Sequence, residues 1–167
     1  MNDTTTLSVN GRTYAWPKQP LVVVCIDGSQ PEYMEEAVAS GHMPFTKEIM
    51  SRGADLRGHC VVPSFTNPNN LSIVTGVPPK VHGISGNFFL DPETGEEVMM
   101  NDPKLLRTGT IFQAFHDAGA KIAIVTAKDK LRRLLGHGLD FTSGRAVCFS
   151  SEKANDTTMA EHGLDNA

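Results

Sequence analysis

The chain has 167 residues, of which 40% are hydrophobic and 20% are charged, and its formal net charge is −4. This balance is typical of a folded domain with a real core and excludes a disordered chain. The mild acidity argues against a nucleic-acid surface or a polybasic membrane patch. The longest apolar run, Leu21–Ile26, is far too short to span a bilayer, and the polar start lacks the apolar stretch of a signal peptide.

The three cysteines, Cys25, Cys60 and Cys148, are odd in number and widely spaced. Each lies among apolar neighbours, so we expect buried, reduced thiols rather than a disulfide framework or a zinc cluster. Reduced thiols indicate a cytoplasmic protein.

In chain order, residues 1–20 form a polar lead-in with a short hairpin at Asn10-Gly11, and residues 21–167 are expected to be the N-terminal part of one catalytic domain. Alternating β-branched runs and amphipathic stretches predict the α/β class, with a mostly parallel sheet flanked by helices. The predicted strands are 21–26, 54–62, 121–126 and 146–149. The predicted helices are 31–40, 44–52, 67–75, 110–118 and 129–135. A small hairpin joins 88–90 to 98–100.

Polar residues follow two of these strands. Asp27 comes directly after the first strand, and Lys128 follows strand 121–126. Parallel sheets bind ligands at the carboxyl ends of their strands, so both residues are expected at one rim. A carboxylate there suits a metal cation, although a cap of the next helix explains Asp27 equally well.

Thr66 lies at the start of the predicted helix 67–75. A helix N-terminus offers N–H groups and a partial positive charge, which favour a bound phosphate and ease deprotonation of a hydroxyl. Taken alone, however, Thr66 is better explained as the N-cap of that helix.

A turn rich in glycine and proline follows this helix and ends at Asn87. The neutral amide of Asn87 is able to donate a hydrogen bond to a phosphoryl oxygen and to strengthen as charge builds there, or simply to satisfy the turn backbone. His82, in the same turn, is better explained as a turn-stabilising histidine than as a metal ligand.

Lys128 and Lys130 flank Asp129 at the start of a predicted helix, where the helix dipole disfavours lysine. Local conflicts of this kind are typical of functional sites. The two ammonium groups are suited to holding an anion, and a solvated surface pair is the alternative.

Taken together, these segments resemble the alkaline phosphatase superfamily, in its nucleotide pyrophosphatase/phosphodiesterase-like branch. The resemblance is carried by Val24-Cys-Ile-Asp-Gly28, Pro63-Ser-Phe-Thr-Asn-Pro-Asn-Asn70, Thr75-Gly76, Pro79, His82-Gly-Ile84 and Gly86-Asn87. Within the branch, Val125-Thr-Ala-Lys-Asp-Lys-Leu-Arg-Arg-Leu-Leu-Gly136 makes the chain most similar to the phosphonoacetate hydrolase family.

The resemblance implies an alkaline-phosphatase-like fold and a site with two zinc ions. It implies Asp27 as a ligand of one zinc and Thr66 as the nucleophile, which also contacts that zinc. It further implies Asn87 as the donor to a phosphoryl oxygen, and Lys128 and Lys130 as a clamp for the substrate carboxylate. The implied reaction is hydrolysis of the carbon–phosphorus bond of phosphonoacetate to acetate and phosphate through a phosphothreonine.

Members of this family are more than twice as long, and their remaining metal ligands lie in the second half. We therefore expect an N-terminal fragment with an incomplete metal site. The implied partner is a small phosphonate, with neither nucleic acid nor a membrane, and a homodimer is compatible with the sequence. Two alternatives stay open: a phosphodiesterase or nucleotide pyrophosphatase of the same branch, which has no need for the lysine pair, and a non-catalytic fragment.

Overall fold

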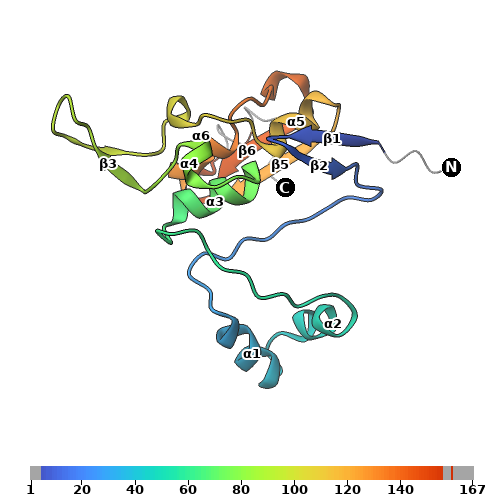
Figure 1. The fold of residues 1–167 in the computed structure, drawn as a ribbon. Coiled ribbons are helices and arrows are strands. Elements are labelled where there is room, and N and C mark those ends of the chain that lie inside the picture. The colour runs from blue at the N-terminus through green and yellow to red at the C-terminus, as the bar shows by residue number, and fades with distance from the viewer. Residues whose placement is uncertain (1–4, 156–158, 160–167) are drawn as a thin grey trace. The chain divides into compact units, whose positions relative to one another are not determined.

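The computed structural model describes residues 5–155 and 159. The chain divides into two compact units (Figure 1), of which the smaller comprises residues 19–60. The larger unit combines residues 1–18 with residues 61–167.

A parallel strand pair lies against the core of the larger unit. It consists of β5 (Ile122–Thr126) and β6 (Ala146–Ser150), with Ile124 opposite Cys148. Parallel neighbours need a crossover connection, which is formed here by η2 (Asp129–Leu131), α6 (Arg132–Leu135) and η3 (Phe141–Ser143). Alternate residues of β6 are buried, as expected for a strand with one face on the core.

The core forms where helices pack on this strand pair. Helices α5 (Ile111–Asp117) and α6 contact β5, and α3 (Thr66–Thr75) contacts both of these helices (Figure 1). The buried residues that form the hydrophobic core cluster are Leu71, Val74, Ile84, Met100, Ile124, Leu131, Leu134, Leu135, Leu139, Ala146 and Cys148. They come from segments throughout residues 71–148, so this unit has one shared core.

Two antiparallel hairpins complete the strands of the larger unit. The first joins β1 (Thr6–Val9) to β2 (Arg12–Ala15) through Asn10 and Gly11. Both turn residues have positive φ, 50° and 77°, as the tight hairpin turn favoured by Asn-Gly requires. The second hairpin pairs β3 (Phe88–Leu90) with β4 (Glu97–Met99) and projects from the unit (Figure 1).

Short helical segments link these elements. The α-helical turn α4 (Pro79–His82) lies between α3 and β3 and packs on α3. The 3-10 turn η1 (Pro103–Leu105) follows β4, and η4 (Ser151–Lys153) follows β6 directly.

The first hairpin is anchored to the rest of its unit by the side chain of Asn10 and by Arg12, whose Nε donates to the carbonyl of Gly76. The Nδ2 atom of Asn10 donates to the carbonyl of Thr75 at 2.9 Å and to that of Gly109 at 2.8 Å. After β2, the ring of Trp16 packs on Phe115 of α5 with centroids 5.6 Å apart. The hairpin is therefore tied to the end of α3 and to the start of α5.

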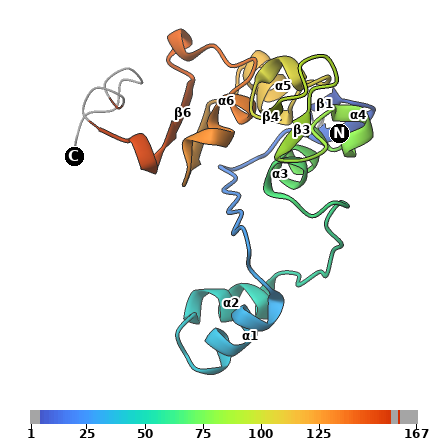
Figure 2. The same cartoon turned by 90° about the vertical axis from the view of Figure 1, so that its left-hand side faces the viewer.

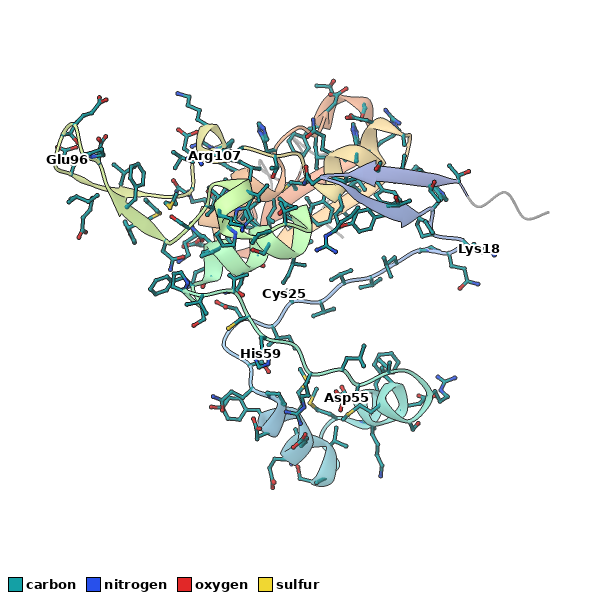
Figure 3. All side chains as sticks on the ribbon, viewed as in Figure 1. Lys18, Cys25, Asp55, His59, Glu96 and Arg107 are labelled. Carbon is teal, nitrogen blue, oxygen red and sulfur yellow. The ribbon has the colours of Figure 1, made fainter. Side chains whose placement is uncertain are left out.

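In the smaller unit, α1 (Pro31–Ala39) and α2 (Pro44–Arg52) contact each other (Figure 2). Each begins with proline, whose missing N–H and fixed φ suit the first helical position. Neither helix has a buried residue. Extended segments flank the pair, and Cys25 and His59 are labelled on them in Figure 3.

The structure confirms the α/β class, the four predicted helices before residue 119, both hairpins and strands 121–126 and 146–149. The predicted helix 129–135 is correct only in part, because its first turn is the 3-10 turn η2. The predicted strands 21–26 and 54–62 are wrong, because neither segment belongs to any of the two-stranded sheets of the described residues. The apolar side chains of residues 21–26 are exposed, from 55% at Ile26 to 82% at Val22. A β-branched run favours extended backbone, but only pairing with neighbouring strands makes it a strand.

The cysteine prediction is correct only in part. Cys148 is buried on β6, whereas Cys25 and Cys60 are exposed. The apolar residues Val24, Ile26 and Val62 near them are exposed as well. No helix in the described ranges combines the length and apolarity needed to cross a bilayer.

Candidate functional site

Thr66 is the first residue of α3 and is half-buried. The N-cap position belongs to Phe65, which has extended backbone, and its carbonyl accepts the helical hydrogen bond from Asn69 N–H at 3.2 Å. The interpretation of Thr66 as the N-cap is therefore wrong. Its hydroxyl lies in the first turn, at the positive end of the helix dipole.

Asn87 supplies a cap to this helix from a distant part of the chain. Its Oδ1 accepts a hydrogen bond from the backbone N–H of Asn67 at 3.1 Å. Because only the amide oxygen is able to accept this bond, the orientation of the Asn87 amide is fixed. Its Nδ2 donates no hydrogen bond to another residue in the range 5–155.

His82 stabilises the turn, as predicted. It is fully buried, and its Nδ1 accepts a hydrogen bond from Ile84 N–H at 3.1 Å. Its Nε2 lies 3.0 Å from the hydroxyl of Ser72 on α3, which donates to the carbonyl of Pro68 at 2.7 Å. Burial lowers the pKa of His82. Both ring nitrogens are engaged, so the metal-ligand interpretation of His82 is not supported.

Lys128 and Lys130 lie on the loop after β5. Lys128 has extended backbone and is exposed, whereas Lys130 lies in η2 and is half-buried. Neither forms an ion pair with another described residue. Asp129 between them instead pairs with Arg132 Nε at 2.6 Å and with Lys153 Nζ at 3.3 Å.

These pairings decide which charges the loop presents. The hydrogen bond from Arg132, with a smaller contribution from Lys153, lowers the pKa of Asp129 below its usual value. Asp129 is thus ionised at neutral pH and neutralised by Arg132 and Lys153. Lys128 and Lys130 form no ion pair with Asp129, and their role as an anion clamp stays a prediction.

Sequence reasoning missed Glu152 in this region. Its carboxylate Oε2 accepts a hydrogen bond from the backbone N–H of Asp129 at 2.8 Å, beside the two lysines. The sequence contained a signal for Glu152, because this residue follows the predicted strand that ends near Ser150. In a parallel pair, that end lies at the same edge as the end of β5.

Asp27 belongs to the smaller unit, whereas Thr66, Asn87, Lys128 and Lys130 belong to the larger one. It is exposed and precedes Gly28, whose φ is 72°. The N-cap of α1 is Gln30, so the alternative interpretation of Asp27 as the cap of that helix is wrong. The structure brings Asn87 to the start of the helix that carries Thr66.

The described residues do not fit a complete metal site. Across residues 5–155 and 159, no three histidine, cysteine, aspartate or glutamate side chains lie close enough to hold a metal ion. A catalytic zinc takes three protein ligands and keeps a fourth position for water or substrate. Asp27 and Thr66, the two ligands that the sequence predicts, would account for only part of such a set.

Comparison with known proteins gives two kinds of relative. A family described as type I phosphodiesterase / nucleotide pyrophosphatase matches residues 21–141. An uncharacterized pyrophosphatase/phosphodiesterase of Schizosaccharomyces pombe is 30% identical over 117 residues, which are 67% of this chain and 22% of that protein. An ectonucleotide pyrophosphatase/phosphodiesterase of Caenorhabditis elegans is 32% identical over 83 residues, or 48% of this chain and 10% of that protein.

Solved structures give a stronger match. Crystal structures of phosphonoacetate hydrolase from Sinorhizobium meliloti 1021, in complex with phosphonoformate and with phosphonoacetate, are each 62% identical to this chain. Each superposes with a TM-score of 0.92 over 99% of this chain and 40% of the solved chain. The α/β fold is therefore alkaline-phosphatase-like, and the chain spans less than half the length of these relatives.

Proposed function

Since this chain belongs to the type I phosphodiesterase / nucleotide pyrophosphatase family, we propose that it supplies the nucleophile half of a phosphonoacetate-hydrolysing site. The reaction is hydrolysis of the carbon–phosphorus bond to acetate and phosphate. The observation that carries the proposal is the 62% identity, over 99% of the chain, to a phosphonoacetate hydrolase solved with phosphonoacetate bound.

Thr66 is the proposed nucleophile. Its Oγ loses the hydroxyl proton to solvent and attacks phosphorus, a P–O bond forms, and the P–C bond breaks with its electron pair moving onto carbon. The neighbouring carboxylate delocalises this pair as an enolate, and a proton then converts the enolate into acetate. Water releases phosphate from the phosphothreonine and restores the hydroxyl. The positive end of α3 favours the phosphoryl charge throughout.

Asn87 and the lysine pair have separate proposed roles. The Nδ2 of Asn87 donates to a phosphoryl oxygen, and its orientation is supported by the bond from Asn67 N–H to Oδ1. Lys128 and Lys130 hold the substrate carboxylate. Because charge on that carboxylate rises as the enolate forms, two nearby ammonium groups stabilise the transition state more than the ground state.

The proposal retains two zinc ions in the intact site, with Asp27 and Thr66 as the ligands from this chain. Since the described residues do not complete the ligand set of either ion, the other ligands are proposed to lie outside residues 5–155 and 159. A cytoplasmic location and a homodimer also stay proposals, which cell fractionation and light scattering test.

A phosphodiesterase or nucleotide pyrophosphatase is the second candidate, favoured by the names of the fungal and nematode relatives. Those relatives are about half as similar to the chain as the phosphonoacetate hydrolase is, with 30% and 32% identity against 62%. The second candidate also leaves the lysine pair without a role.

A chimera tests the proposal. Residues 1–167 replace the matching 40% of the Sinorhizobium meliloti enzyme, so that the rest of that chain supplies what this chain lacks. We expect ³¹P NMR to show phosphonoacetate converted to phosphate, with acetate released in equal amount and zinc bound to the chimera. A folded, zinc-loaded chimera that prefers a phosphodiester, or that leaves phosphonoacetate intact, would contradict the proposal.

A further inference from the structure

Two hydrogen-bonded ties connect helix α3 with the turn that precedes β3. The first joins the backbone N–H of Asn67 to Asn87 Oδ1, at the start of the helix. The second joins the Ser72 hydroxyl to His82 Nε2, near the middle of the helix. The proposed nucleophile lies beside the first tie, and the proposed phosphoryl donor is part of it.

The hydrogen bonds of His82 define a single protonation state. Because Nδ1 accepts from Ile84 N–H, the ring proton lies on Nε2 and points at Ser72 Oγ. The Ser72 hydroxyl accepts from Nε2 and in turn donates its own hydrogen to the carbonyl of Pro68, in the first turn of α3. One neutral ring thus links the turn backbone at residue 84 to the helix backbone at residue 68.

The backbone between His82 and Asn87 has little freedom. Arg107 N–H donates to the carbonyl of His82 at 3.0 Å, and Met100 N–H donates to that of Asn87 at 2.8 Å. At Gly83, φ is 91° and a Cβ would lie 2.6 Å from the carbonyl oxygen of Leu105, so only glycine fits. Ile84 is fully buried in the core. A shift of the His82 ring would therefore be transmitted along this short segment to Asn87.

We propose that His82 is a positioning residue, which holds the amide of Asn87 in register with the first turn of α3 and hence with Thr66. The inference rests on the proposed function for the roles of Thr66 and Asn87, and on the hydrogen bonds of this chain for the coupling. His82 does not touch the reacting atoms. It fixes the phosphoryl donor relative to the nucleophile, where a displacement of about 1 Å is able to cost on the order of 100-fold in rate.

Two substitutions at His82 separate its two hydrogen bonds. In His82→Asn the side-chain oxygen takes the place of Nδ1, so the acceptor for Ile84 N–H is kept and the donor to Ser72 is lost. In His82→Gln the side-chain amide takes the place of Nε2, so the donor is kept and the acceptor is lost. Exposed His137, in the same unit, provides the matched control His137→Gln.

The first measurement uses the chain by itself and needs no activity. Amide NMR and hydrogen exchange report on the Asn67 N–H, whose partner is Asn87. If His82 sets the position of Asn87, His82→Gln shifts the amide resonance of Asn67 and speeds the hydrogen exchange of that amide. The amides of β5 and β6 keep their protection. An Asn67 amide that is unchanged, or exchange that accelerates equally throughout the unit, overturns the inference because His82 would then be merely structural.

The second measurement uses the chimera. Since Asn87 and Thr66 serve any phosphoryl substrate, we expect His82→Gln to lower kcat by the same factor, about 10- to 100-fold, for phosphonoacetate and for an aryl phosphate. KM for phosphonoacetate stays near its original value, because the lysines are untouched. Ser72→Ala, which removes the acceptor on α3, has the same signature, and His137→Gln has no effect. An unchanged kcat in His82→Gln overturns the inference.

The two proposals fail separately. A chimera that does not act on phosphonoacetate contradicts the proposed function, and the Asn67 amide still reports whether His82 positions Asn87. An active chimera whose Asn67 amide ignores both His82 substitutions contradicts the positioning role and leaves the proposed function standing.

Discussion

In the proposed site, Lys128 and Lys130 are the residues that favour a phosphonate over a phosphodiester as substrate. Their charges are not neutralised by Asp129, which pairs with Arg132 and Lys153 instead. The sequence predicted both lysines from an unfavourable position at a helix start, but it did not predict how Asp129 is paired. The second partner, Lys153, lies 24 residues away and comes close through the parallel pairing of β5 and β6.

We predict that Lys128→Ala and Lys130→Ala in the chimera lower kcat/KM for phosphonoacetate by about 10- to 100-fold each, the amount expected for one hydrogen bond to a charged group. An aryl phosphate has no carboxylate, so its hydrolysis should change little. Steady-state kinetics on both substrates provide the test, with the exposed Lys121→Ala as a control. Equal losses on the two substrates would remove the case for a carboxylate clamp.

Protonation of His82 should be visible in the stability of the chain. Burial depresses its pKa below the ordinary value of 6.5, so the unfolded state binds a proton first as the pH falls. The contribution of neutral His82 to the free energy of unfolding is therefore fully present above pH 6.5. It declines as the pH falls from 6.5 towards the lower pKa that His82 has in the folded state. The depressed pKa of Asp129 acts in a separate window, below its ordinary value of 3.8.

We therefore predict that the free energy of unfolding falls more steeply below about pH 6.5 in the unmodified chain than in His82→Gln. Urea unfolding between about pH 5 and 8 measures this slope. His137→Gln should follow the unmodified chain. Parallel curves for the unmodified chain and His82→Gln would show that His82 is not held neutral in the folded state.

At the scale of the element, local sequence signals predicted helices and hairpins well. Asn10-Gly11 predicted a tight turn because both residues tolerate positive φ, and the structure has this turn. The turn sequence does not predict that Asn10 has a second role. Its amide holds the hairpin to the carbonyls of Thr75 and Gly109, which are 65 and 99 residues away.

We predict that Asn10→Asp destabilises the chain more than Asn10→Gly. Glycine keeps the positive φ and loses two hydrogen bonds, at a cost of about 1–3 kcal/mol. Aspartate also tolerates the turn, but it places carboxylate oxygens against two carbonyls, so it adds repulsion to the same loss. Urea unfolding of both variants measures the difference. A smaller effect for Asn10→Asp would show that the two hydrogen bonds do not form.

The strand prediction for residues 21–26 failed for a related reason. Local sequence reports that the run is apolar and favours extended backbone, and the backbone there is not helical. Burial and strand pairing are properties of the sheet that a segment joins, and the described sheets do not include this one. The same reasoning explains why Cys25 was expected to be buried and is exposed.

At the scale of the whole molecule, the order of short motifs predicted the family and the α/β fold, and the comparisons confirm both. Thr66 and Asn87 were individually ambiguous, and the structure brings Asn87 to the helix of Thr66 through Asn67 N–H. The position of Asp27 could not be predicted in the same way. It belongs to the smaller unit, whereas Thr66 and Asn87 belong to the larger one.

The central claim is that Thr66 is the nucleophile, and acid quenching of the chimera during turnover of phosphonoacetate tests it most directly. Mass spectrometry of the peptide that carries Thr66 should show the mass of one added phosphoryl group, located on this residue. Thr66→Ala should lose both the modified peptide and acetate release while the chimera remains folded. Normal acetate release by Thr66→Ala, or a phosphoryl group found on another residue, would contradict the account.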